Sequence, residues 1–220
     1  MGGVRSNLFV DANHLTPYYY SVMICIDEKG WDIDVSTNST ALRQSIQIMD
    51  FSTMDSDLRG FSEAIRVGRF AYLAPFSHSQ NKFSSKFIRI DLGDIDIGTQ
   101  LKKVYQSGGT VRNVVDILDL SKKNTALKGF SGLFMSGQYL LLVPYRNAYE
   151  PQNGQRGHGN IVRLDMNQFH DLDNGVEYMD LSTTIRAQIP SFSDMNLKGF
   201  AGGFSCKLVD GWIGGLLIVR

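Results

Sequence analysis

The sequence has few cysteines and no cysteine motif. Its 220 residues contain two, Cys25 and Cys206, and no C-x-x-C pair. Two cysteines cannot form a disulfide scaffold, and without paired spacing they predict neither a zinc site nor a redox motif. We interpret both as buried free thiols, which pack as small apolar side chains.

The sequence also lacks net charge and long apolar runs. Lys plus Arg (22) balances Asp plus Glu (22), so no overall field attracts polyanions, and we expect no nucleic-acid partner. Its most apolar stretches, YLLLVPY and WIGGLLIV, fall far short of the ~20 residues that span a bilayer. The first 15 residues have no apolar core of a signal peptide. These absences predict a soluble, intracellular protein without membrane insertion.

Motifs of catalysis and metal binding are missing as well. The four histidines are scattered, and we interpret them as loop residues: His14, His78, His158 and His170. No H-E-x-x-H pattern is present, and Gly-Phe-Ser-Gly-Leu is not a nucleophile elbow. The acidic stretches DLGDIDIG and DEKGWDID lack the closing Glu of a calcium loop. The sequence therefore predicts no catalytic residue, no metal and no cofactor.

What the sequence does contain is an internal repeat. LRGFSEAIRVGRFAYLAPF (58–76) aligns without a gap with LKGFSGLFMSGQYLLLVPY (127–145), 69 residues later, and LKGFAGGF (197–204) begins a third copy. An aspartate precedes each Gly-Phe pair, at Asp50, Asp119 and Asp180. Such repeats indicate stacked supersecondary units that share a core, and a hydrophobic content of 43% supplies enough apolar material for it.

The repeat divides the chain into four units within one domain, 1–220. An incomplete unit covers about 8–51, because VMICIDE and SIQIMDFS resemble the later parts of a repeat. Full units follow at about 58–120 and 127–181, and a partial unit covers about 197–220. The N-terminal unit offers a second, third and fourth segment, and the C-terminal unit offers the first and part of the second.

Each full unit contains four segments that read as strands. In the second full unit they are about 129–135, 138–145, 160–166 and 175–181, short and rich in aromatic and branched residues. Gly137 suits a tight hairpin between the first two. Four antiparallel strands that cannot bury both faces alone are typical of a propeller blade. We therefore expect an all-β protein, a β-propeller-like array of four-stranded antiparallel blades with two full and two partial units.

A proline ends the apolar run of each full unit. Proline has no N–H to donate to a ladder, so Pro75 and Pro144 predict a strand end or a bulge. The stretch RNAYEPQNGQRGHGN (146–160) that follows the second is polar and glycine-rich. We expect a loop there, outside the sheet.

The third segment carries an Arg-x-Asp pair, Arg89 with Asp91 and Arg163 with Asp165. Residues two apart share one face of a strand. We interpret these residues as structural, either as ion pairs between blades or as aspartates that accept backbone N–H groups at turns. A ligand-binding role is the alternative.

These patterns resemble a group of poorly characterised repeat proteins whose units look like kelch-type β-propeller blades. GFSGLFMSGQYLLLVPY with GNIVRLD, GFSEAIRVGRFAYLAPF with KFIRID, and GFAGGF carry the resemblance. The first full copy departs from it, with Ser-Glu-Ala at 62–64 where Gly-Gly is expected. The resemblance implies a fold and no activity, because propellers serve many functions.

Two functional hypotheses follow. The first is a non-catalytic protein-interaction or scaffold module, a subunit of a larger complex whose open edges a protein partner covers. The alternative is a carbohydrate- or small-ligand-binding propeller, lectin-like or enzymatic, with a site at the central face. Its candidate ligand-binding residues are Tyr145, Arg163, Asp165, Arg89 and Asp91. Whether the partial units close one blade together stays open here.

Overall fold

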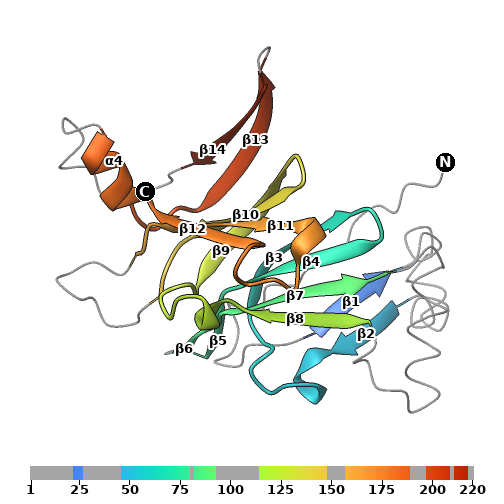
Figure 1. Ribbon diagram of the computed structural model, residues 1–220. Coiled ribbons are helices and arrows are strands. Elements are labelled where there is room, and N and C mark those ends of the chain that lie inside the picture. Colours follow the sequence, from blue (N-terminus) through green and yellow to red (C-terminus); the bar gives the residue numbers. More distant parts are fainter. Residues whose placement is uncertain are drawn as a thin grey trace, which may run out of the picture.

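The computed structural model describes residues 22–26, 46–79, 82–92, 114–147, 157–188, 197–208 and 211–217. Within these ranges the protein is built from antiparallel sheets, and the expectation of an all-β fold is confirmed. Two four-stranded sheets form its centre, and a two-stranded sheet stands at either end (Figure 1). His14 and the stretches LTPYYY and DEKGWDID lie outside the described residues.

Both four-stranded sheets are meanders that follow the repeat. The first sheet has the order β3 (Phe61–Val67), β4 (Phe70–Pro75), β7 (Lys86–Asp91) and β8 (Val115–Asp119). The second has β9 (Phe130–Ser136), β10 (Tyr139–Pro144), β11 (Asn160–Asp165) and β12 (Val176–Asp180) in the same order. The four strand segments predicted for the second full unit are therefore confirmed, with bounds shifted by at most one residue.

Some elements lie between the predicted strands. A small hairpin, β5 (Ser77–Ser79) and β6 (Lys82–Phe83), follows Pro75, so His78 lies in a strand and not in the loop that we expected. Short 3-10 helices follow the strands at Phe51–Thr53, Leu120–Lys122 and Met166–Gln168, and the helix α4 (Leu181–Gln188) follows β12. The helix occupies the start of the longer spacer before the third Gly-Phe pair.

The two prolines end their strands at bulges, as predicted. Pro75 lies opposite Phe61 and Pro144 opposite Phe130, and the register shifts by one residue beside each. The shift leaves Ser62 and Ser131 as the extra residues of the bulged strands. Ser131 Oγ donates a 2.7 Å hydrogen bond to the carbonyl of Phe200, in the third copy.

The N-terminal sheet consists of the third and fourth strands of a unit. It pairs β1 (Val22–Ile26) with β2 (Ile46–Asp50), and Met23 lies opposite Met49. Ile161 lies opposite Met179 in the second full sheet at the equivalent position, and the whole register of the two pairs is the same. The alignment of the incomplete first copy with the end of the repeat stays a prediction.

The C-terminal sheet consists of the first two strands of a unit. It pairs β13 (Gly202–Leu208) with β14 (Gly211–Leu217). Phe204 lies opposite Gly215, as Phe134 lies opposite Leu141 in the second full sheet. Strand β13 packs against β9 in the same way that β9 packs against β3.

Three apolar clusters alternate with the sheets. The central cluster joins the two full sheets, and its largest members are Tyr72, Phe87, Phe130, Leu133, Leu142 and Phe169. A second cluster covers the opposite face of the first sheet and includes Phe51, Ala71, Leu73, Ile88 and Ile90. A third covers part of the opposite face of the second sheet and includes Phe134, Val143, Leu181, Leu197 and Phe200. Both faces of each full sheet therefore contribute to a core, as in stacked repeats.

Candidate docking face

The first two Gly-Phe pairs each form a corner, in which the glycine carbonyl binds the end of the second strand of the same sheet. The Gly129 carbonyl accepts hydrogen bonds from the backbone N–H groups of Tyr145 (3.2 Å) and Arg146 (2.9 Å). Gly60 accepts the equivalent pair of bonds in the first unit. Gly129 has φ +74°, and a Cβ there would lie 1.5 Å from the Arg146 carbonyl oxygen. Only glycine fits this corner.

One residue per unit joins this corner to the next unit. Ser84 N–H donates to the Phe76 carbonyl (2.9 Å), and the Ser84 carbonyl accepts from Gly129 N–H (3.1 Å). His158 does the same one repeat later, with the Tyr145 carbonyl (3.0 Å) and Gly199 N–H (3.2 Å). The third copy is therefore attached to the second as the second is to the first.

The imidazole of His158 is buried at this junction. Its Nε2 lies 3.2 Å from the Gly129 carbonyl oxygen, and Nδ1 accepts from Asn160 N–H at 3.3 Å. Burial lowers its pKa to about 4, although the hydrogen bond to Gly129 acts in the opposite direction. A neutral ring protonated on Nε2 satisfies both contacts. The interpretation of His158 as a loop residue is confirmed, because it belongs to no strand or helix, but its burial was not predicted.

A glutamate also joins the two full sheets. Glu63 Oε2 accepts a 3.0 Å hydrogen bond from Leu133 N–H in β9. Gly132 leaves room for this carboxylate, because a Cβ there would lie 2.3 Å from Glu63 Oε2. Glu63 belongs to the Ser-Glu-Ala that replaces the expected Gly-Gly in the first copy. The replacement thus supplies a contact between units.

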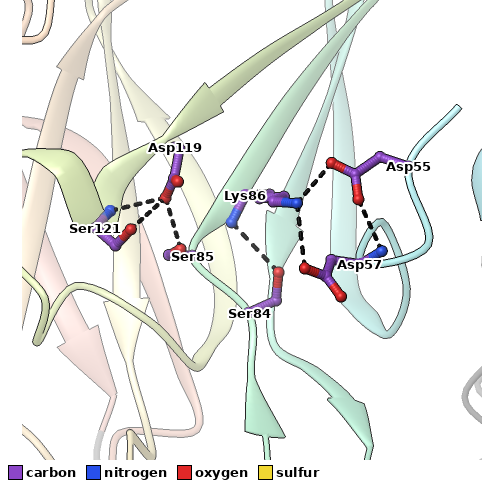
Figure 2. A network of polar contacts seen from close by, with 7 residues as sticks. All are labelled: Asp55, Asp57, Ser84, Ser85, Lys86, Asp119 and Ser121. Atoms are coloured by element: carbon purple, nitrogen blue, oxygen red, sulfur yellow. Dashed lines mark hydrogen bonds and ion pairs between the residues drawn. The ribbon is translucent and has the colours of Figure 1, made fainter.

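A polar network fixes the start of β7, where strands and turns of the first unit meet (Figure 2). Lys86 Nζ donates to Asp55 (2.5 Å) and Asp57 (3.3 Å), and Asp119 accepts from Ser121 and from Ser85 Oγ (2.7 Å). The bond from Lys86 lowers the pKa of Asp55. Burial acts to raise the pKa of Asp119, but the hydrogen bonds from Ser121 and Ser85 outweigh it and lower that pKa.

The interpretation as strand-end caps is confirmed for two aspartates, Asp119 of this network and Asp180 of the second sheet. Asp119 accepts from Ser121 N–H, and Asp180 accepts from Ser182 N–H, each two residues beyond a strand. Such caps satisfy backbone donors where the ladder stops. The side chain of Asp50 lies outside the described residues.

Arg89 connects the two full units. Its guanidinium lies between two rings, with Cζ 4.5 Å from the centroid of Phe70 and 4.3 Å from that of Phe169. It also donates to Asp116 on β8 at 3.0 and 2.7 Å. Phe70 belongs to the same sheet and Phe169 to the next unit. The predicted tie between units is therefore present: Arg89 makes a cation–π contact with Phe169, and its Nη2 lies 3.1 Å from Nε2 of the neighbouring His170.

The second sheet repeats this arrangement, but without an aromatic ring among the described residues in the place of Phe169. Arg163 Cζ lies 4.6 Å from the centroid of Tyr139, and its guanidinium donates to Glu177 on β12. Tyr139, Arg163 and Glu177 correspond to Phe70, Arg89 and Asp116 in the repeat. The side chain of Arg163 is 48% exposed, against 14% for Arg89. The difference arises because no described residue takes the place of Phe169.

We call the side of the second sheet that faces away from the first sheet the exit face. It comprises Tyr139, Leu141, Val143, Ile161, Arg163, Glu177 and Met179. Phe200 and Leu197 pack over its β9–β10 half. Ile161 of β11 packs against the same cluster. The other side chains of the β11–β12 half are exposed, Arg163 to 48%, Glu177 to 63% and Met179 to 43%. The equivalent face of the first sheet is closed by the second unit.

The other predicted site residues are dispersed. Asp91 is paired with Arg69 of the β3–β4 turn, and Asp165 accepts from Gln138 Nε2 (3.0 Å) and Asn167 N–H (2.9 Å). Tyr145 packs against Phe76, its counterpart one repeat earlier, with ring centroids 5.8 Å apart. Each of the five predicted residues contacts other parts of the protein, and a ligand-binding role for them stays a prediction.

Sequence reasoning missed the acidic partners, Asp116 and Glu177, and the covering ring of Phe169. An available signal was the alignment of VDILD with VEYMD, which places both acids one residue after the first valine of the fourth strand. No comparable signal identified Phe169, because its role depends on the unit before it.

The described residues contain no group of three or more His, Cys, Asp or Glu side chains arranged to hold a metal ion. Nor does any helix in the part of the chain that the structure describes have the length and apolar character to cross a membrane.

Comparisons with known proteins give one match. The flagellar basal body rod protein FlgB of Proteus mirabilis (strain HI4320) is 26% identical over 106 residues, which are 48% of this chain and 70% of that protein. No family model matches the chain, and no solved structure does.

Proposed function

We propose that the chain is a non-catalytic scaffold of β-propeller-like units that binds a protein partner. The partner binds the exit face and the edge of β14, which among the described residues pairs only with β13. The observation that carries this proposal is the difference between two equivalent faces. In the first sheet Phe169 of the next unit covers Arg89, and the side chains of Arg89 and Asp116 are 14% and 37% exposed. In the second sheet the equivalent Arg163 and Glu177 are 48% and 63% exposed. A partner that supplies a flat, sheet-like surface with an aromatic side chain complements that face.

The proposed propeller-like arrangement rests on how the units stack. The first strands of successive units, β3, β9 and β13, lie next to one another. Sheets that approach most closely along their first strands fan outward, as blades do around a central axis.

Membership in a larger assembly has separate support. The matching relative is by name a rod protein of the flagellar basal body. No observation favours the alternative of carbohydrate or small-ligand binding, since the five residues proposed for it do not converge on one site.

Two methionines allow a matched test. Met179 and Met135 belong to the same sheet and are equally exposed, at 43%, but they point to opposite faces. A photo-crosslinking amino acid at position 179, in protein expressed in its native cells, should capture one protein of defined mass. The same group at position 135 should not. Equal capture at both positions, or capture at neither, would count against the proposal.

A further inference from the structure

The junction between the second and third copies of the repeat contains a titratable group that the first junction lacks. His158 and Ser84 occupy equivalent positions, since the carbonyl of each accepts the N–H of the next Gly-Phe pair, at Gly199 and Gly129. We infer that protonation of His158 releases the third copy from the second sheet, while the two full sheets stay joined. This inference concerns the junction alone and holds whether or not the exit face binds a partner.

The hydrogen bonds of the His158 ring fit only its neutral form. With its proton on Nε2, the ring donates to the Gly129 carbonyl oxygen (3.2 Å), and Nδ1 accepts from Asn160 N–H (3.3 Å). A second proton, on Nδ1, places two donors face to face. His158 is also only 5% exposed and packs against the ring of Phe130, with centroids 5.5 Å apart. The ring must therefore leave the junction before it can be protonated.

Burial dominates the electrostatics of this ring. The titratable side chains on the segments that contact it are Lys128, Tyr145, Arg146, Asp180 and Lys198. Burial lowers the pKa of His158 to about 4, although the backbone of Gly129 and the charge of Asp180 act to raise it. A ring released into water has the ordinary value of 6.5. Between these values a proton binds the open junction more tightly than the closed one, so acid favours opening.

The hydrogen bonds of the third copy to the second sheet begin at His158. Gly199 N–H donates to the His158 carbonyl (3.2 Å), and Phe200 N–H donates to the Pro144 carbonyl (2.9 Å). When the ring withdraws, the His158 backbone moves with it and the first of these bonds is lost. The two full sheets are joined differently, through Ser84, which does not titrate in this range, and through the central apolar cluster. Acid therefore opens one junction and leaves the other closed.

Two glycine amides provide a matched measurement of the two junctions. Gly129 and Gly199 both stand in the sequence LKGF, so their unprotected amides exchange hydrogen at the same intrinsic rate at any pH. In the folded protein Gly129 N–H is bonded to Ser84 and Gly199 N–H to His158. The ratio of their protection factors therefore compares the two junctions within one molecule.

Hydrogen exchange of the full 220-residue chain at pH 7 and pH 5 tests the inference. Protection of Gly199 relative to Gly129 should fall about 20-fold on acidification, the factor given by a pKa that changes from 6.5 to about 4. His158→Gln, whose amide can donate to Gly129 but does not titrate, should hold the ratio within about twofold. If that variant does not fold, His158→Ser, which copies the residue of the first junction, provides the same comparison.

Three results would overturn the inference. The first is a wild-type ratio that does not change with pH. The second is an equal change in the His158→Gln chain, which would assign the effect to another group. The third is an equal loss of protection at both glycines, which would mean that acid loosens the whole protein. Capture of a partner at position 179 is independent of all three, so this inference and the proposed function stand or fail separately.

Discussion

The buried imidazole of His158 makes stability depend on pH in a defined window. Its pKa of about 4 in the folded protein lies below the ordinary 6.5, because burial disfavours the charged ring. Between these two values the unfolded chain binds more protons than the folded protein does. The stabilisation is therefore complete above about pH 6.5 and is lost as the pH falls toward 4.

We expect His158→Gln to remove this dependence, because its amide can donate to the Gly129 carbonyl but does not titrate. The wild-type free energy of unfolding should fall by about 3 kcal/mol more than that of the variant between pH 7 and pH 4. Urea unfolding at a series of pH values measures the difference. His78, whose pKa burial also lowers, is present in both proteins and cancels. Parallel pH profiles would show that His158 is not responsible.

At the scale of elements, the corner at Gly129 joins β9 to the end of β10 and to the unit before it. A side chain there faces two separate obstacles, the positive φ and the Arg146 carbonyl. Gly137, in the β9–β10 hairpin, has φ +61° but no atom within 4 Å of a Cβ. Alanine variants of Gly129 and Gly137 therefore separate the cost of backbone strain from the cost of a steric clash.

Gly137→Ala should cost about 1 to 2 kcal/mol of stability, the strain of a left-handed residue. Gly129→Ala should cost at least about 3 kcal/mol, because the carbonyl of Arg146 must move and its neighbours lose hydrogen bonds. Chemical denaturation of both variants measures this. Equal losses would mean that the corner relaxes without cost.

For the whole molecule, stability should be unevenly distributed among the units. The two full sheets share the central cluster, whereas each end sheet has two strands, and two-stranded sheets are marginal alone. Hydrogen exchange in dilute solution should therefore be slowest for amides of β9 and β10 and fastest for those of β1 and β14. Exchange of β14 as slow as that of β10 at every dilution would contradict this distribution.

The sequence alone determined the parts of the architecture that repeat locally. Strand segments, the hairpin at Gly137 and the bulges at Pro75 and Pro144 depend on residues close together in the chain, and the copies confirm one another. The same applies to the capping by Asp119 and Asp180, because the backbone N–H groups that they accept from lie two residues away. Local hydrogen-bonding and steric rules are sufficient for such features.

Only the tertiary structure decided which side chains meet between strands and units. Arg89 and Arg163 look alike in the sequence, but one is enclosed by Phe169 and the other is open. The burial of His158 and the contact of Glu63 with β9 depend in the same way on how units stack. These contacts join residues many positions apart, and sheet stacking and twist, which no single repeat encodes, bring them together.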